Sequence, residues 1–267
     1  MSKTEILSII NQKGGVGKTT TAINLTAGLA QKNKKILVID LDPQGNATTG
    51  LGISNSESSE KTIYAVLNGT KKIVDVIKKT QFSNLDLISS NVDLSGLEVE
   101  TAGDSRRAFI LKEQIMAYLN DFSGKYDYIF IDCPPSLSLL TVMALVASNS
   151  LIVPLQTEFF ALEGLTQLMK TIERIKIHLN SELKIKGILL TMYDKRNKLS
   201  GQVEKEARDY FREKVYSTVI PRNVRLSEAP SHGVPVLIYD KLCPGSKSYF
   251  NFTEEFLSKQ ETFVSAA

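Results

Sequence analysis

The sequence predicts an α/β fold with a doubly wound, mostly parallel sheet and helices on both of its faces. Short apolar runs typical of buried strands recur along the chain, and two of them, residues 35–40 and 126–132, end in an aspartate. Segments with apolar residues at helical spacing separate these runs. A glycine-rich loop joins the first strand to the first helix. Strands that alternate with helices require right-handed crossovers, which place parallel strands in one sheet.

The strands are expected where short apolar runs are bounded by turn residues or by proline, since proline cannot extend a central strand. The expected strands are residues 6–10, 35–40, 85–89, 126–132, 151–155, 185–191 and 215–220. The helices are expected where apolar residues recur every three or four positions. The expected helices are residues 19–31, 63–67, 73–79, 106–119, 137–147, 161–179, 202–214 and 246–257. Residues 52–61 and 222–230 are expected to form loops.

The composition is that of an ordinary globular protein, with 42% hydrophobic and 23% charged residues in a chain of 267. No linker or repeat divides the chain, so residues 1–267 are expected to form a single domain, with 258–267 as a loosely ordered tail. No apolar run approaches the ~18 residues that span a bilayer. Without a signal-peptide pattern, and with two cysteines too few for a disulfide framework, we expect a cytoplasmic protein.

The loop at residues 11–19 has the features of a phosphate-binding site. Its glycines, Gly14, Gly15 and Gly17, permit positive φ and let backbone N–H groups face a polyphosphate. The helix that follows begins at the anion and adds partial positive charge there. Lys18 supplies a point charge for the phosphates, and Thr19 is placed to bind Mg²⁺.

Two strands end in carboxylates at the edge where a parallel sheet presents such a loop. Phosphoryl transfer needs a metal ion and an oriented water, and acidic side chains at this edge provide both. Asp132 is expected to hold Mg²⁺ through a bound water. Asp42 is the candidate for positioning the attacking water, while Asp40 is a further candidate near the metal but outside its direct ligands.

Five stretches together resemble the deviant Walker A ATPases of the ParA/MinD family, in particular the small chromosomal ParA type often called Soj. They are residues 13–19 (Lys-Gly-Gly-Val-Gly-Lys-Thr), 40–46, 132–136, 191–194 and 220–230. The usual Walker A pattern has glycine at its first position, where this chain has Gln12. The chain instead carries a second lysine, Lys13, which is the mark of the deviant loop.

The resemblance implies an ATP-driven switch for DNA segregation of a chromosome or plasmid. In such proteins Mg²⁺ and ATP hold two copies in a sandwich dimer, Lys13 reaches the partner's phosphates, and the dimer binds double-stranded DNA without sequence preference. A ParB-like centromere-binding partner then stimulates hydrolysis and release. The nucleotide contacts implied are Lys13, Gly14, Gly15, Val16, Gly17, Lys18, Thr19, Thr20, and, at the adenine, Pro221 and Asn223. The catalytic residues implied are Lys13, Lys18 and Asp42.

The net charge of +3 hides a basic segment. Residues 184–247 hold 13 Lys/Arg and 7 Asp/Glu, so the remainder of the chain is slightly acidic. A local basic excess is compatible with nucleic-acid contact, although a solvated helix of mixed charge, such as residues 202–214, is the commoner explanation for any one of these charges. The resemblance places Arg222 and Arg225 on the DNA side, which implies association with the nucleoid. Further DNA-binding candidates are Lys195, Arg196, Lys198, Lys241 and Lys247.

Two alternatives stay open at this point. One is a MinD-like ATPase that works on the membrane surface to place the division site. Its C-terminal helix should be amphipathic and basic, whereas residues 251–267 hold three glutamates and a single lysine. The other is a metallocluster-delivery ATPase, which would need a Cys-x-x-Cys pair, whereas the two cysteines of this chain, Cys133 and Cys243, lie far apart in the sequence. We therefore expect no membrane binding.

Overall fold

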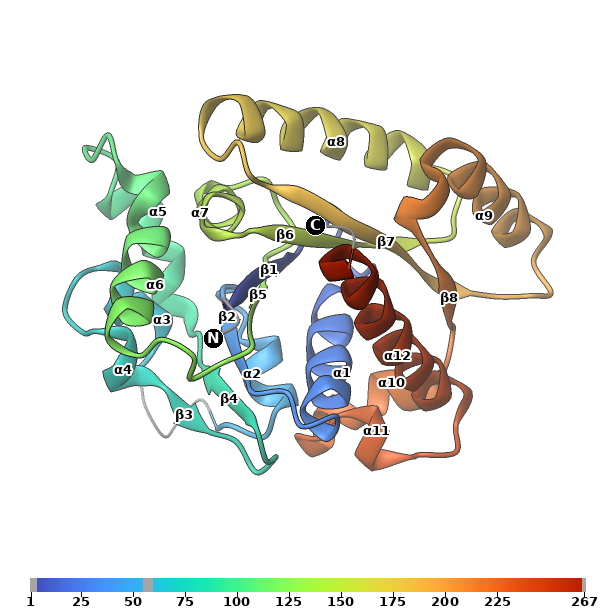
Figure 1. Ribbon diagram of the computed structural model, residues 1–267, viewed down its shortest axis with the longest axis horizontal. Helices are drawn as coiled ribbons and strands as arrows, with labels where there is room; N and C mark the ends of the chain where they lie inside the picture. The colour runs from blue at the N-terminus through green and yellow to red at the C-terminus, as the bar shows by residue number, and fades with distance from the viewer. Residues whose placement is uncertain (1–3, 55–59, 266–267) are drawn as a thin grey trace.

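The computed structural model describes residues 4–54 and 60–265, and for residues 260–265 it describes the backbone alone. Its centre is an eight-stranded sheet in the order β3-β4-β2-β5-β1-β6-β7-β8 (Figure 1). The strands are β1 (Glu5–Ile9), β2 (Ile36–Asp40), β3 (Lys78–Lys79), β4 (Leu85–Ile88), β5 (Tyr128–Asp132), β6 (Ser150–Gln156), β7 (Lys184–Tyr193) and β8 (Val215–Pro221). All neighbouring pairs are parallel except β3 with β4. The predicted fold class is confirmed.

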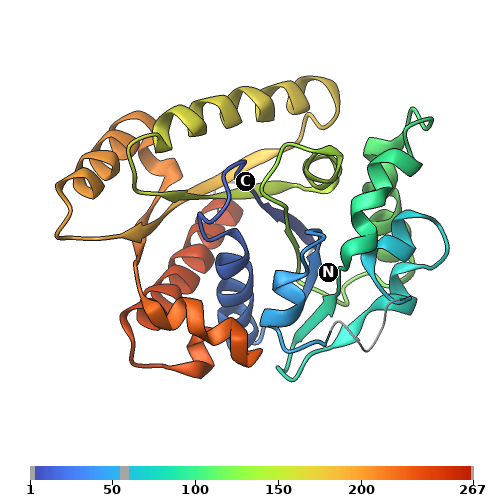
Figure 2. The same ribbon diagram turned by 180° about the vertical axis from the view of Figure 1, so that it is seen from behind.

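Helices cover both faces of the sheet (Figures 1 and 2). The helices are α1 (Lys18–Gln31), α2 (Asn46–Gly50), α3 (Ile63–Leu67), α4 (Ile73–Val76), α5 (Leu97–Glu100), α6 (Ile110–Asp121), α7 (Leu139–Ala147), α8 (Ala161–His178), α9 (Lys198–Phe211), α10 (Val224–Glu228), α11 (Val236–Tyr239) and α12 (Pro244–Ser265). α1, α11 and α12 pack on one face, and α6, α7, α8 and α9 on the other. None of the helices within the described ranges is long and apolar enough to cross a bilayer.

The core consists of two apolar layers, one on each side of the sheet. Successive residues of a strand enter opposite layers, as the two-residue period of a strand requires. In β5, for example, Ile129 and Ile131 pack toward α6 and α7, while Tyr128 and Phe130 pack toward α12. Both faces of the central strands are therefore buried, which explains why these strands appear in the sequence as unbroken apolar runs.

The register of the central strands brings their carboxyl ends to one line. Ile9 of β1 lies opposite Asp132 of β5, and Asp132 lies opposite Asp40 of β2. β1 also pairs with β6, so the chain builds the sheet outward on both sides of β1. In such sheets ligands bind beyond the carboxyl ends, at the point where the strand order reverses.

The predicted helix at 73–79 is wrong in its second half. α4 ends at Val76, and Lys78–Lys79 forms β3, a short antiparallel edge strand. Once paired with β4, Lys78 donates a hydrogen bond to Ser89 (2.6 Å) and Lys79 contacts the Asp86 carboxylate (2.8 Å). Tertiary pairing thus overrides the local helical spacing.

The predicted loop at 222–230 is also wrong, because it contains α10 and then a 3₁₀ turn at Ala229–His232. α12 continues past residue 257, the predicted end of the closing helix, and the structure describes its backbone as helical to Ser265. α2, α5 and α11 were not expected; each spans only four or five residues, too few for helical spacing to identify a helix dependably, although α3, of the same length, was predicted correctly. Of the predicted loop at 52–61, residues 55–59 lie outside the described residues. The single-domain count and the loose tail remain predictions.

The outer edge of β8 is closed by side chains instead of by another strand. The Glu255 carboxylate of α12 accepts hydrogen bonds from the backbone N–H groups of Ser217 (2.7 Å) and Thr218 (2.8 Å). The guanidinium of Arg208, from α9, donates to the carbonyls of Tyr216 (3.0 Å) and Ser217 (3.2 Å). Burial acts to raise the pKa of Glu255, but these N–H donors and Lys259 lower it below its ordinary value.

Replacing Glu255 by Gln should therefore destabilise the protein at neutral pH, by about 1–3 kcal/mol, because an amide nitrogen would face an N–H donor. A carboxylate whose pKa is lowered by folding stabilises above its ordinary pKa and loses that contribution as the pH falls. The two proteins should then converge in stability below the ordinary value of 4.5. Urea denaturation at several pH values measures the difference. Glu254→Gln, at a more exposed position on the same helix, is the control; an equal effect there would refute the assignment.

Candidate active site

The glycine-rich loop connects β1 to α1 and leaves the first turn of α1 open. Gly15 (φ 74°) and Gly17 (φ 88°) adopt positive φ, as predicted, whereas Gly14 does not. Gly17 occupies the N-cap position of α1 and, being glycine, provides no side-chain cap to the turn that follows. The first N–H groups of α1 are thus available to an anion, and the helix dipole favours negative charge there.

Lys18 lies buried within this loop, with only 6% of its surface exposed. Its ammonium donates a hydrogen bond to the carbonyl of Lys13 (2.9 Å), which holds it inside the curve of the loop. Burial lowers the pKa of Lys18, and the nearby Asp132 carboxylate opposes that shift. An anion with several oxygens would complete the charge balance around a cation held in this way.

Lys13 points outward from the same loop. Its side chain is half exposed and forms an ion pair with Glu158, in the turn between β6 and α8. Sequence reasoning did not identify Glu158, because nothing local connects two residues that meet only through the sheet topology. The pairing shows that the Lys13 ammonium, unlike that of Lys18, does not converge on the N-terminus of α1 in a single chain.

Asp40 is a buried carboxylate whose hydrogen bonds are all used within the fold. It accepts from the Thr48 N–H (2.8 Å) and hydroxyl (2.7 Å) and from the Asp42 N–H (3.2 Å). Burial raises the pKa of Asp40 to about 6, while the Thr48 and Asp42 hydrogen bonds limit the rise. These contacts attach α2 to the end of β2. The geometry therefore indicates that the main role of Asp40 is to hold α2 in position.

Asp132 differs sharply from Asp40. Both of its carboxylate oxygens are buried and accept no well-formed hydrogen bond from the residues that the structure describes. Burial, and then the charge of Asp40, raise the pKa of Asp132 well above its usual range, while the Thr19 hydroxyl and Lys18 lower it in part. Buried polar atoms normally have partners, so an unsatisfied carboxylate here points to a partner from outside the chain.

A hydrated Mg²⁺ fits this arrangement. Mg²⁺ usually binds one or two protein oxygens and completes its shell with waters and substrate phosphates. The Thr19 hydroxyl would bind the metal directly and Asp132 would hold one of its waters. Within the described part of the chain, no three Asp, Glu, His or Cys side chains form a metal cage of their own. The donor set therefore suits a metal that arrives with a phosphate ligand.

Asp42 follows β2 by two residues and is buried at the same edge. One of its oxygens accepts from the Gln44 N–H (3.0 Å), which fixes the carboxylate in an Asx-type turn. It belongs to the same electrostatic group, since it raises the pKa of both Asp40 and Asp132. Unlike Asp40, Asp42 accepts no hydrogen bond from a side chain of another helix or strand within the described residues.

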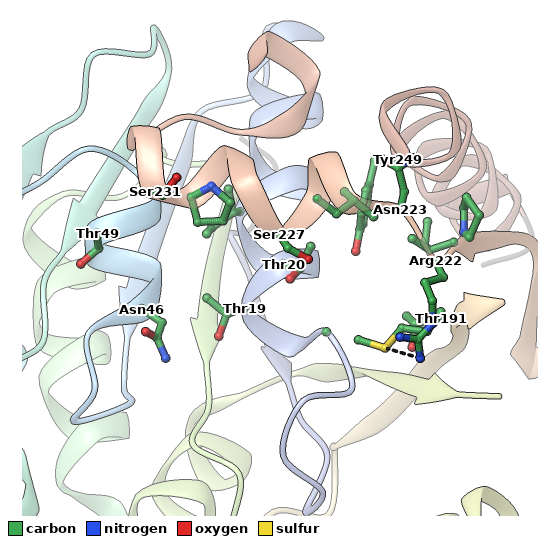
Figure 3. Close-up of a pocket in the computed structure, with 17 residues that line it drawn as sticks. Thr19, Thr20, Asn46, Thr49, Thr191, Arg222, Asn223, Ser227, Ser231 and Tyr249 are labelled. Carbon is green, nitrogen blue, oxygen red and sulfur yellow. Dashed lines mark hydrogen bonds between the residues drawn. The ribbon is translucent and has the colours of Figure 1, made fainter. Parts of the chain in front are cut away.

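A cavity of about 470 Å³ opens beside Thr19 and Thr20 (Figure 3). Pro221 and Asn223, both predicted at the adenine, line it from the end of β8 and the start of α10. The side-chain oxygen of Asn223 is buried and has no hydrogen-bond partner among the described residues. An apolar wall with one unsatisfied polar group is suited to a flat heterocycle. The sequence did not single out the other lining residues Asn46, Thr49, Ser227, Ser231 and Tyr249.

The loop is anchored by contacts that the sequence did not reveal. Thr191, at the end of β7, donates to the carbonyl of Val16 (2.9 Å). Asn11 donates to the carbonyl of Pro154 (2.8 Å) and accepts from the Lys13 N–H (3.0 Å). Asn11 and Thr191 each lie within a motif noted in the sequence. Nothing else in the sequence indicated that they would anchor the loop.

The predicted DNA-binding residues gather only in part. Lys195, Arg196 and Arg222 line one hollow between the ends of β7 and β8. Arg222 also borders the nucleotide-sized cavity and extends toward Met192 (Figure 3). Lys198, Lys241 and Lys247 are exposed but do not line that hollow.

Two of these arginines are already paired within the chain. Arg225 contacts the carboxylates of Glu228 (2.7 Å) and Asp240 (3.5 Å). Arg196 contacts Asp194 (2.9 Å). Surface pairs of this kind are weak and can exchange partners, so they reduce the free positive charge without removing it.

Known proteins share this sequence over nearly its whole length. The AAA domain family model matches residues 4–185. The chromosome partitioning protein ParA of Caulobacter vibrioides is 53% identical over 255 residues, which cover 96% of this chain and 94% of that protein. The sporulation initiation inhibitor protein Soj of Bacillus subtilis is 50% identical over 251 residues, covering 94% and 97%.

Solved structures share the fold. Cobyrinic acid a,c-diamide synthase of Mycobacterium smegmatis, with a bound ATP analogue and magnesium, has a TM-score of 0.82 at 32% identity and covers 97% of this chain and 96% of its own. The MinD protein of Pyrococcus horikoshii, complexed with Mg-ADP, has a TM-score of 0.77 at 28% identity, covering 94% and 95%. Together with the loop geometry, these likenesses establish that the chain belongs to the ParA/MinD family, as a Soj-like chromosome-partitioning ATPase.

Proposed function

We propose that this chain is a Mg²⁺-dependent ATP switch for DNA segregation, which dimerises with ATP and binds double-stranded DNA. The observation that carries the proposal is the unsatisfied, buried Asp132 carboxylate beside Thr19 and Lys18 at the open end of α1. A cation, a metal site and free N–H groups converge there. That combination suits a nucleoside triphosphate with its metal; one structural relative was solved with an ATP analogue and magnesium, and another with Mg-ADP.

A bound Mg²⁺ would supply charge neutralisation on the phosphates, and the chain's own residues would do the positioning. The loop N–H groups and Lys18 would hold the phosphates, Thr19 and Asp132 would hold the metal, and Asp42 would orient the attacking water. Asp40 fixes α2 and keeps Asp42 in place through the Asp42 N–H. Pro221 and Asn223 receive the adenine.

Lys13 provides the proposed contact between the two copies of the dimer. In the single chain its ammonium pairs with Glu158 and not with the phosphate site. In the ATP-bound dimer it would leave Glu158 and contact the phosphates of the other copy. A symmetric pair of such contacts makes dimer formation depend on ATP in both protomers.

The dimer would double the basic hollow formed by Lys195, Arg196 and Arg222 and thereby bind the nucleoid without sequence preference. A ParB-like centromere-binding partner would then stimulate hydrolysis, and the dimer would separate and leave the DNA. The names of the partitioning relatives support this reading. We therefore place the ATP-bound protein in the cytoplasm, bound to the nucleoid.

Asp42→Ala tests the hydrolytic role. The variant should bind ATP and dimerise as before, yet hydrolyse ATP roughly 10²-fold more slowly or worse, because only water positioning is lost. Phosphate release gives the rate, and light scattering gives the dimer. Asp209→Ala, an exposed acid on α9, is the control. Normal turnover in Asp42→Ala would transfer the role to another residue.

Lys13→Ala tests the dimer contact. The variant should bind ATP as a monomer but fail to dimerise, since Lys18 remains in the loop while the cation for the partner's phosphates is gone. Glu158→Gln should dimerise at least as well as the wild type, because Lys13 is released. Calorimetry and light scattering measure both properties, with the exposed Lys170→Ala as the control. An ATP-dependent dimer of Lys13→Ala would refute the assignment.

The double variant Arg222→Ala/Arg225→Ala tests the DNA face. It should dimerise with ATP but bind duplex DNA more weakly, with the log–log salt slope lowered by roughly 0.9 for each phosphate that the variant no longer neutralises. Arg222→Ala alone should show most of the change, because Arg225 is paired with Glu228 and Asp240. DNA titrations across a salt series provide the slope. An unchanged slope would place the DNA-binding face elsewhere on the protein. If the double variant instead loses ATP binding, these arginines belong to the nucleotide site.

A further inference from the structure

One carboxylate holds both ends of the segment that carries Asp42. Asp40 accepts from the Asp42 N–H at Oδ1 (3.2 Å), and from the N–H (2.8 Å) and hydroxyl (2.7 Å) of Thr48 at Oδ2. Residues 43–47 lie between these two attachments and include the start of α2. A single side chain at the end of β2 therefore fixes this segment at residue 42 and again at residue 48.

The Thr48 hydroxyl connects Asp40 to a third strand. It donates its hydrogen to Asp40, and its oxygen accepts from the backbone N–H of Ser90 (3.1 Å), two residues after the end of β4. Thr48 is fully buried, so water does not compete for these bonds. A hydroxyl can donate and accept through one atom, whereas a valine of the same shape can do neither.

The turn between the two attachments has little freedom of its own. The Gln44 N–H donates to the Asp42 carboxylate (3.0 Å), and the Gly45 N–H donates to the Asp42 carbonyl (2.9 Å). Gly45 has a positive φ of 64°, and its own carbonyl accepts from the Thr49 N–H (3.0 Å) in the first turn of α2. The direction of the Asp42 carboxylate therefore follows the position of α2.

The two ends of α2 are secured in different ways. At the C-terminal end, Gly50 packs closely on α1, since a Cβ placed there would lie 2.4 Å from Cδ1 of Ile23. At the end nearer Asp42, the hydrogen bonds of Thr48 secure the helix. Between them, Asn46 and Thr49 line the nucleotide-sized cavity beside Thr19 (Figure 3).

We propose that Thr48 is a positioning residue for ATP hydrolysis, which sets the direction of the Asp42 carboxylate through Asp40 and α2. This rests on the proposed function, in which Asp42 orients the attacking water. Thr48 itself does not line the cavity, so it acts through these neighbours. Misplacing a reacting group by about 1 Å can slow a reaction on the order of 10²-fold, so a small shift of α2 is enough to matter.

This role differs from a general contribution to the core. Loss of a purely structural contact would weaken the whole protein, including its binding of nucleotide. Loss of the Thr48 hydroxyl should instead affect kcat selectively, because Lys18 and the N–H groups at the start of α1 hold the phosphates without help from Thr48.

The test measures the steady-state hydrolysis of Mg-ATP by Thr48→Val. Its kcat should fall at least tenfold, while its KM and its calorimetric affinity for ADP stay within threefold of the wild type. Thr48→Ser should recover kcat to within threefold, because the hydroxyl is restored. Thr26→Val is the matched control, since Thr26 is equally buried but its hydroxyl donates only within α1, to Ala22 (2.5 Å) and Ile23 (3.2 Å). It should hydrolyse ATP as the wild type does.

A double-mutant cycle then asks whether Thr48 acts through Asp42. Single-turnover phosphate release gives the rates of the slow variants. In the Asp42→Ala background, Thr48→Val should change the rate less than twofold, because the carboxylate that Thr48 directs is gone. If thermal melts show that Thr48→Val does not fold, Thr48→Cys takes its place under the same criteria, since a thiol is of similar size but a weak donor.

Three outcomes would overturn the proposal. The first is a wild-type kcat in Thr48→Val, and the second is a further tenfold loss when Thr48→Val is added to Asp42→Ala. The third is normal turnover in Asp42→Ala alone, which would leave the protein an ATPase but remove the group that Thr48 positions. A wild-type protein that hydrolyses no ATP would overturn the proposed function as well.

Discussion

The parallel pairing of β1, β2 and β5 is the constraint on which the active site depends. Its register places Ile9, Asp132 and Asp40 opposite one another on neighbouring strands. The loop after β1 and the carboxylates at the ends of β2 and β5 therefore lie close together. Burial on both faces maintains the register, because a slip of one residue would turn apolar side chains of one layer into the other. The apolar core thus also fixes the geometry of charged groups.

Those charged groups carry an electrostatic cost that the protein's own side chains relieve only in part. Burial raises the pKa of both Asp40 and Asp132. The charge of Asp40 raises the pKa of Asp132 further, and the charge of Asp42 raises the pKa of both. Asp40 recovers part of the cost through two hydrogen bonds from Thr48, whereas Asp132 accepts no well-formed hydrogen bond from the described residues and is relieved only in part by Thr19 and Lys18. A bound metal ion, as proposed for this site, would offset the remaining cost, and ligand binding would then be linked to the stability of this edge of the sheet.

The sequence predicted the parts of the site that are local. The loop at 13–19 and the aspartates at strand ends are short patterns with a direct physical meaning, so their positions followed once parallel strands were assumed. The ion pair of Lys13 with Glu158 could not be predicted, since the two residues meet only through the sheet order. The conversion of Lys78 and Lys79 to a strand depended likewise on pairing with β4. Arg225 was predicted on the DNA side, and a pair with Glu228, three residues on, was the competing interpretation; the structure shows that pair and adds Asp240, which only the tertiary fold brings close.

The closure of β8 by Glu255 and Arg208 also limits how copies of the protein can assemble. An unpaired edge strand is a template for other chains, and repeated strand addition produces fibres. Here the exposed N–H and carbonyl groups of Ser217 and its neighbours are occupied by side chains, and the opposite edge is β3, a strand of two lysines. The described part of the sheet therefore offers no long unpaired edge on which open-ended strand polymers could start, even where many copies gather on one surface.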